Sequence, residues 1–153
     1  MSLLKKIALI LMAAGATFAL IVVSVIVYQY TAMEPPLPND TDCEMQRLLQ
    51  TSENAAEIHH YYCQRGAGKD WQGHELWLVE PASERWQRML TTTSPQCLAL
   101  TIERQTLLVE HDGDKGEMNL AEPVFIYKDL NGQSQTLAVD INNKPTANCS
   151  ENN

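Results

Sequence analysis

The sequence predicts an α+β fold, in which an N-terminal transmembrane helix precedes an external domain with one amphipathic helix packed on an antiparallel β-meander of about five to six strands. Three observations lead to this prediction: a long uncharged apolar run, a stretch with helical spacing, and a later region in which apolar residues alternate. The expected divisions are a cytoplasmic N-terminus (1–6), a membrane anchor (7–28), a proline-rich juxtamembrane linker (29–41), the external domain (42–143) and a polar tail (144–153).

The predicted anchor runs from Ile7 to Tyr28 and contains no charged residue. At about 1.5 Å per residue it forms a helix about 33 Å long, which matches a hydrocarbon core of about 30 Å. A cleaved signal peptide is the alternative, but its apolar region is typically only about 7 to 15 residues long. Gly15 and Ala19 form a small-xxx-small pair that would let another helix approach, although small residues are common in membrane spans.

The flanks of this run predict its orientation. Lys5 and Lys6 precede it, and Tyr28 and Tyr30 lie at the other end as interfacial aromatic residues. Because basic residues stay on the cytoplasmic side, the N-terminus is expected inside and the C-terminal domain outside. We therefore expect a single-pass protein of the bacterial inner membrane whose domain faces the periplasm.

The external part is acidic. Beyond the span, 9 basic residues oppose 19 acidic ones, for a formal charge of −10. Such a surface repels nucleic acid and anionic lipid head groups. The expected partners are the bilayer, through residues 7–28, and another membrane protein, and nucleic acid is excluded.

All four cysteines lie beyond the span, at Cys43, Cys63, Cys97 and Cys149. An even number of cysteines in an oxidising compartment indicates disulfides. No pair has the C-x-x-C spacing, so neither a thioredoxin-type motif nor a zinc ribbon is supported. Four thiols allow three pairings.

A helix is predicted over residues 42–64. Thr41 and Glu44 have the spacing of a capping box, and Gly66 and Gly68 would end the helix. Between them the less polar residues recur at steps of three and four, at Met45, Leu48, Leu49, Ser52, Ala55, Ala56, His59, Tyr62 and Cys63.

A continuous helix would hold Cys43 and Cys63 about 30 Å apart, whereas a disulfide needs Cα atoms about 5.5 Å apart. Each would then have to bond to Cys97 or Cys149. A break at residues 50–54 would instead create a helical hairpin, in which Cys43 could reach Cys63.

The motif "HHYYCQRG" (59–66) has the composition of a reactive site. His59 and Cys63 stand four apart on one helical face, a spacing compatible with two metal ligands. A closed zinc site needs two more ligands, and the spacing of His74 and His111 does not supply them. We interpret the motif as a helix end with a stapling cysteine, and we expect no metal, no cofactor and no catalytic residue.

The second half reads as strands. "HELWLVEP" and "ERWQRML" flank the turn "PASE", although a short helix capped by Ser83 is an alternative for the latter. Leu98, Leu100 and Ile102 share one face, before a turn at 104–105 and a further strand. Asn131 and Gly132 form the turn of the plainest hairpin in the chain.

The aromatic residues of these strands are expected mainly in the core. A strongly curved meander could instead close towards a small barrel and hold an apolar ligand. A pocket of that kind would be lined by Trp77, Trp86 and Phe125.

The acidic run 112–117 suggests a calcium loop. An EF-hand requires Gly and Glu at its positions 6 and 12, where this chain has Glu117 and Pro123, so we interpret the run as a hairpin turn. No short catalytic signature is present. The leading hypothesis is a non-enzymatic accessory, assembly or regulatory subunit that binds another membrane protein. The alternatives are a sensor or carrier of a small apolar ligand, and an enzyme centred on Cys63, His59 and His60.

Overall fold

A computed structural model describes residues 3–32, 35–51, 55–93, 98–112 and 118–144. Within these ranges the chain forms one N-terminal apolar helix and a mostly antiparallel domain of nine strands, consistent with the α+β class. The chain divides into two compact units, residues 1–36 and 37–153.

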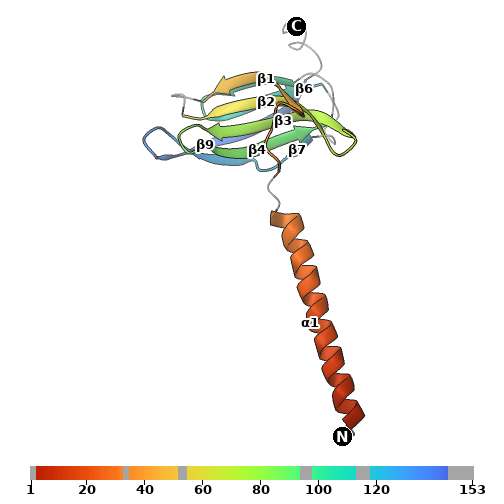
Figure 1. The fold of residues 1–153 in the computed structure, drawn as a ribbon. Coiled ribbons are helices and arrows are strands. Elements are labelled where there is room, and N and C mark those ends of the chain that lie inside the picture. Colours follow the sequence, from red (N-terminus) through yellow and green to blue (C-terminus); the bar gives the residue numbers. More distant parts are fainter. Residues whose placement is uncertain (1–2, 33–34, 52–54, 94–97, 113–117, 145–153) are drawn as a thin grey trace. The chain divides into compact units, whose positions relative to one another are not determined.

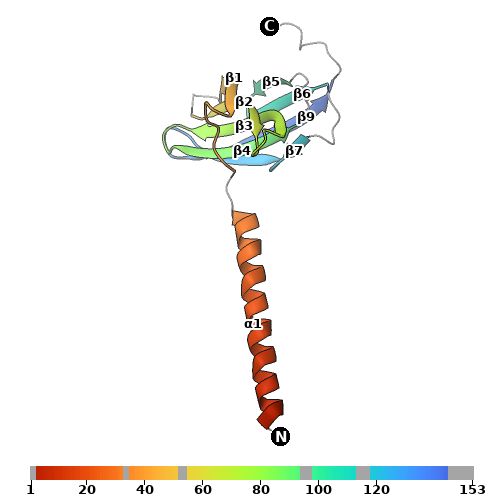
Figure 2. The same ribbon diagram turned by 45° about the vertical axis from the view of Figure 1, so that its right-hand side comes forward.

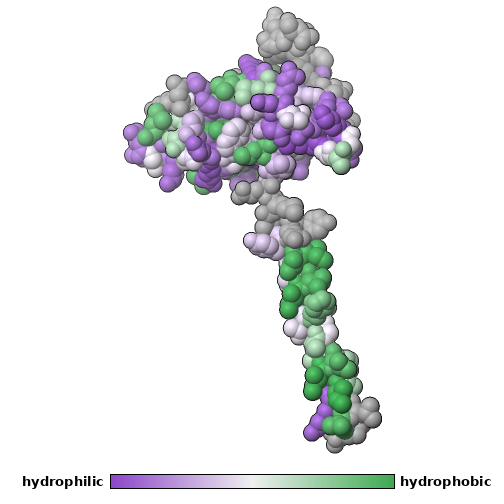
Figure 3. All heavy atoms as spheres, viewed as in Figure 1, coloured by the Kyte–Doolittle hydropathy of each residue, from purple (hydrophilic) through white to green (hydrophobic). Residues whose placement is uncertain are grey.

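The first unit is helix α1, Leu3–Ala32, which is longer at both ends than the predicted span. From Lys5 to Tyr28 the helix is long and apolar enough to cross a membrane, and none of that window is buried. Figure 3 shows its almost uniformly hydrophobic surface. Among the described residues, nothing outside the backbone of α1 lies within 4 Å of a Cβ added at Gly15.

The second unit consists of two sheets. The five-stranded sheet has the order β1-β2-β3-β4-β7, formed by Cys43–Gln50, Glu57–Arg65, Trp71–Glu80, Arg85–Thr92 and Met118–Leu120. The four-stranded sheet has the order β5-β6-β9-β8, formed by Leu98–Glu103, Thr106–His111, Ser134–Asn143 and Val124–Lys128. Figures 1 and 2 show the two layers.

The core lies between the two sheets, because one buried cluster draws on both. Ile58, Leu76, Leu78 and Leu90 come from the five-stranded sheet, and Leu100, Leu107, Val109, Phe125 and Leu137 come from the four-stranded sheet. We call the side of the five-stranded sheet that carries Ile58 and Leu76 its core face and the opposite side its outer face. The fold is therefore a sandwich rather than a single curved meander, and the nine described strands form no closed barrel.

One pairing departs from the antiparallel expectation. β6 pairs with β9 in parallel, with Val109 opposite Ile141, because the chain crosses to the other sheet as β7 before it returns as β8 and β9. The hairpin interpretation of residues 112–117 is accordingly wrong, since β6 and β7 belong to different sheets. Residues 113–117 themselves lie outside the described residues.

The predicted amphipathic helix over residues 42–64 is wrong. The described residues of this range form the antiparallel strands β1 and β2, and residues 52–54 of the considered helix break lie outside the described residues. A β-bulge between Met45 and Arg47 shifts the register, so Met45 and Leu48 lie on the same outer face although they are three residues apart. That spacing imitates the period of a helix.

The predicted hairpins of the second half are confirmed. β3 and β4 flank the "PASE" turn, so the alternative short helix after Ser83 is wrong. β5 and β6 flank a turn in which Arg104 has a φ of 56°. β8 and β9 flank the Asn131–Gly132 turn, where Gly132 adopts a φ of 77° and Asp129 Oδ1 accepts hydrogen bonds from the Asn131 and Gln133 amides.

Polar side chains join the two sheets along the edge of β8. Gln87 of β4 donates from Nε2 to the Ile126 carbonyl at 3.1 Å, and the Lys128 amide donates to Glu80 Oε2 at 3.3 Å. These contacts use backbone groups on the side of β8 that faces away from β9. The free edge of β8 is therefore partly closed to another strand.

Candidate functional site

A disulfide joins the first residue of β1 to β2. Cys43 and Cys63 are directly opposite one another, with Cα atoms 4.0 Å apart. The Gln64 amide donates to the Asp42 carbonyl at 2.7 Å, which makes the cysteines a non-hydrogen-bonded pair, the closer of the two kinds of antiparallel pair. The pairing that a continuous helix would forbid is thus the one that forms, because the segment is a β-hairpin.

A buried ion pair lies beside this disulfide on the outer face. Arg65 of β2 donates from Nε to Glu75 Oε1 at 3.0 Å and from Nη2 to Oε2 at 2.9 Å. Trp77 Nε1 donates to the same Oε2 at 2.9 Å. Glu75 and Trp77 are each only 1% exposed, and the buried carboxylate of Glu75 accepts hydrogen bonds from three donors.

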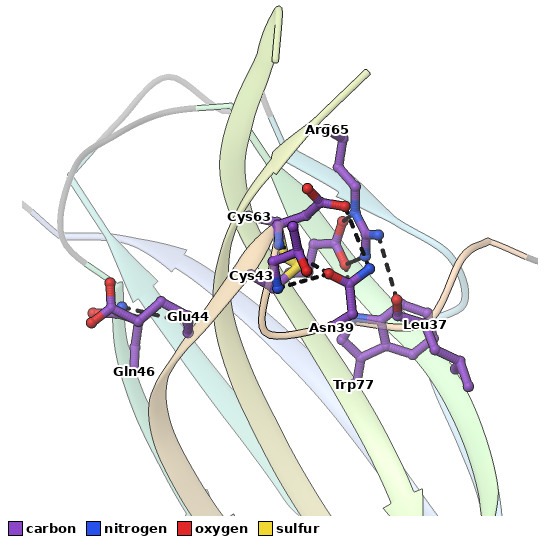
Figure 4. Close-up of a disulfide and its surroundings, with 11 residues drawn as sticks. Leu37, Asn39, Cys43, Glu44, Gln46, Cys63, Arg65 and Trp77 are labelled. Atoms are coloured by element: carbon purple, nitrogen blue, oxygen red, sulfur yellow. Dashed lines mark hydrogen bonds and ion pairs between the residues drawn. A yellow bond between two sulfur atoms is a disulfide. The ribbon is translucent and has the colours of Figure 1, made fainter. Parts of the chain in front are cut away.

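The chain enters the domain across this site. We call residues Leu37–Asp42 the entry segment. Arg65 Nη1 lies 3.5 Å from the Leu37 carbonyl, a long hydrogen bond that Figure 4 draws as a dashed line. Asn39 closes a turn, because its carbonyl accepts from the Cys43 amide and its Oδ1 accepts from the Thr41 and Asp42 amides. The entry segment is thereby held on the outer face.

The chemistry of this cluster is structural. The two sulfur atoms and a carboxylate oxygen of Glu75 lie within 4.8 Å of one another, the only such group of three among the described residues. The sulfur atoms are bonded to each other and are not thiolates, and Glu75 is occupied by Arg65 and Trp77. The cluster therefore fixes the entry segment and offers no free ligand to a metal ion.

His59 belongs to a second group on the outer face. Its Nε2 lies 2.7 Å from Glu57 Oε2, its Nδ1 lies 3.2 Å from the Tyr61 hydroxyl, and its ring meets Trp86 edge-on at 5.2 Å. Burial, and secondarily Asp40 of the entry segment, raises the pKa of Tyr61. Tyr61 is therefore held as a neutral phenol and not as an activated nucleophile.

His60 points to the opposite, core face and is paired with His74. His60 Nε2 and His74 Nδ1 are 2.9 Å apart, so one ring donates and the other accepts. Burial, followed by the neighbouring His74 and Arg47, lowers the pKa of His60 to about 3, and burial also lowers the pKa of His74. The motif therefore separates its two histidines between two faces of one strand.

The three aromatic residues predicted to line an apolar pocket are not brought together. Trp77 and Trp86 meet edge-to-face at 6.2 Å on the outer face. Phe125 belongs instead to the core cluster between the sheets. An open depression of about 860 Å³ lies elsewhere, around the β5–β6 turn and Asp140 of β9, and Leu108 is the one apolar residue among those that line it.

The other predicted site residues are distributed as follows. Lys5 and Lys6 lie in the first turns of α1, Tyr28 lies near its end with an exposed ring, and Ala19 and Tyr30 are also helical. Cys97 and Cys149 lie outside the described residues. The sequence reasoning missed Arg65 and Glu75, and the only signal for them was a glutamate alternating with tryptophan inside an apolar strand.

No family model, curated protein or solved structure matches this chain.

Proposed function

We propose that the chain is a non-enzymatic, single-pass membrane protein whose external domain binds or stabilises another membrane protein as an accessory, assembly or regulatory subunit. In this proposal α1 is the anchor, the N-terminus is cytoplasmic and the domain faces an oxidising compartment, the periplasm in a bacterium. The apolar surface of α1 and the disulfide support this placement.

The observation that carries the proposal is the attachment of the entry segment. A flexible linker would let the domain move freely above the membrane. Here the disulfide, the Asn39 turn and the Arg65 contact tie the last residues before β1 to the outer face. A domain attached in this way keeps a defined orientation relative to its own entry point, which suits recognition of a partner in the same bilayer.

The competing hypotheses receive less support. The aromatic residues of the proposed apolar pocket lie on two faces. The thiol hypothesis required a free Cys63, and this residue is in a disulfide.

Affinity capture from membranes in mild detergent tests the proposal. We expect the tagged full chain to retain another membrane protein in a fixed ratio, and a control that joins residues 1–36 to an unrelated soluble domain to lose it. Protease added to intact cells with a permeabilised outer membrane should remove the domain and spare the N-terminus. A chain that migrates alone and monomeric at every mild detergent concentration would overturn the proposed function.

A further inference from the structure

Strand β1 forms an open edge of the five-stranded sheet, where another strand could pair. β1 pairs only with β2 in this sheet, and its burial pattern is exposed at six of eight positions. The other described edges are less suited to pairing. β7 has three residues, and β8 is contacted along its free edge by Glu80 and Gln87. β1 is longer than β5 and carries two exposed apolar side chains, Met45 (46% exposed) and Leu48 (43% exposed).

The hydrogen-bond pattern shows which backbone groups of β1 face outward. Cys43–Cys63 is a non-hydrogen-bonded pair, and Met45, two residues further on, pairs with Tyr61 in the same way. At the other end the Thr51 amide donates to the Ala56 carbonyl, so Gln50 and, two residues before it, Leu48 are also in non-hydrogen-bonded pairs. The amides and carbonyls of Met45 and Leu48 therefore point away from β2.

The bulge gives this edge its symmetry. In a regular strand, residues three apart have side chains on opposite faces. Because of the extra residue between Met45 and Arg47, the side chains of Met45 and Leu48 lie on the same face, and the backbone amides and carbonyls of both point away from β2. When two copies of β1 run antiparallel with the bulges at the axis, Met45 of each lies opposite Leu48 of the other. Each such pair can exchange two backbone hydrogen bonds and one apolar contact.

Charge and membrane geometry agree with this register. On the other face of β1, Glu44 of one copy lies diagonally from Arg47 of the second, so the two arginines nearest the axis are each flanked by a carboxylate. The twofold axis is perpendicular to the sheet, so both outer faces lie on the same side. The two entry segments, each held by Arg65 on its own outer face, therefore lie on the same side of the joined sheet, which is compatible with two chains anchored in one bilayer.

We propose that two copies of this chain pair through β1 to form a continuous ten-stranded sheet across a twofold axis. The inference rests on the proposed function only in placing both copies in one membrane, where confinement raises their effective concentration. It does not depend on a different partner protein.

The test compares variants of the full chain in mild detergent or nanodiscs by mass photometry and sedimentation. Leu48→Pro removes an amide that bonds to nothing within β1–β2, so it should spare the fold and weaken the dimer about tenfold or more. Met45→Lys should act in the same direction. Ile126→Lys, at an apolar residue of β8 that is also exposed (56%, against 46% for Met45), is the matched control and should leave the dimer intact.

A charge exchange tests the register. Glu44→Arg and Arg47→Glu should each weaken the dimer, and the double variant should restore it. A monomeric wild-type chain, or a dimer that Leu48→Pro and Met45→Lys leave unchanged while circular dichroism shows a native fold, overturns the inference. A monomer that still captures another membrane protein would overturn the dimer and support the proposed function. A β1-dependent dimer that captures no other membrane protein would support the dimer and overturn the proposed function.

Discussion

Arg65 and Glu75 form a two-pronged ion pair between neighbouring strands, with N–O distances of 3.0 and 2.9 Å, directly beneath the entry segment. Replacing Glu75 with Ala would remove the acceptor of two donors. These are the guanidinium of Arg65, whose side chain is 15% exposed, and the indole N–H of Trp77. Breaking a buried pair in this way costs about 3–5 kcal/mol. We expect a loss of that size in urea unfolding of the full chain in detergent. The exposed Glu122→Ala is the control, and a loss below about 1 kcal/mol for Glu75→Ala would show that the pair does not stabilise the fold.

The disulfide closes a loop with a sequence separation of 20 residues. In the chain-entropy account such a loop contributes about 3 kcal/mol. The double variant Cys43→Ser/Cys63→Ser should therefore have a free energy of unfolding about 3 kcal/mol lower than that of the wild type, measured by urea unfolding. Peptide mapping without reductant should recover Cys43 linked to Cys63, and recovery of either cysteine linked elsewhere would contradict the hairpin.

Gly73 lies on β3, opposite Cys63 of β2, and the backbone of Thr92 in β4 passes close to it. A Cβ added at Gly73 would lie 2.0 Å from the Thr92 carbonyl oxygen and 2.9 Å from the Trp71 ring. Because the nearer atom is backbone, Gly73→Ala should destabilise the domain by about 1–3 kcal/mol. Gly68→Ala is the matched control, since nothing lies within 4 Å of its added Cβ, and it should be nearly neutral. Equal unfolding midpoints for the two variants would contradict the close approach.

The buried His60–His74 pair predicts acid sensitivity. The pKa of His60 is lowered from 6.5 to about 3, so below pH 6.5 the unfolded chain takes up a proton that the folded chain refuses. The free energy of unfolding should therefore be independent of His60 above that pH. As the pH drops from 6.5 towards 3, it should fall by up to about 1.4 kcal/mol per pH unit because of this histidine. His60→Gln should reduce the slope in unfolding experiments between pH 7 and pH 4. An identical slope in both proteins would rule out His60 as the cause.

Several features followed from local pattern. The uncharged apolar run contains enough consecutive apolar residues to span a bilayer, and it forms the long helix α1 that the sequence predicted. The hairpins β3–β4, β5–β6 and β8–β9 were also predictable, because each has alternating apolar residues and a short turn with suitable residues, such as Asn131–Gly132.

Tertiary structure decided the rest, and β1–β2 show why. The bulge places Met45 and Leu48 three apart on one face, and the outer face of β2 is itself partly covered, so neither strand displays the alternation by which strands are identified. The division into two sheets and the parallel β6–β9 pair depend on contacts between residues far apart in the chain. By itself the sequence determined the apolar helix and the local hairpins, since those depend on neighbouring residues. The disulfide partner, the buried Arg65–Glu75 pair and the held entry segment depend on which strands become neighbours in space, and only the folded chain decides that.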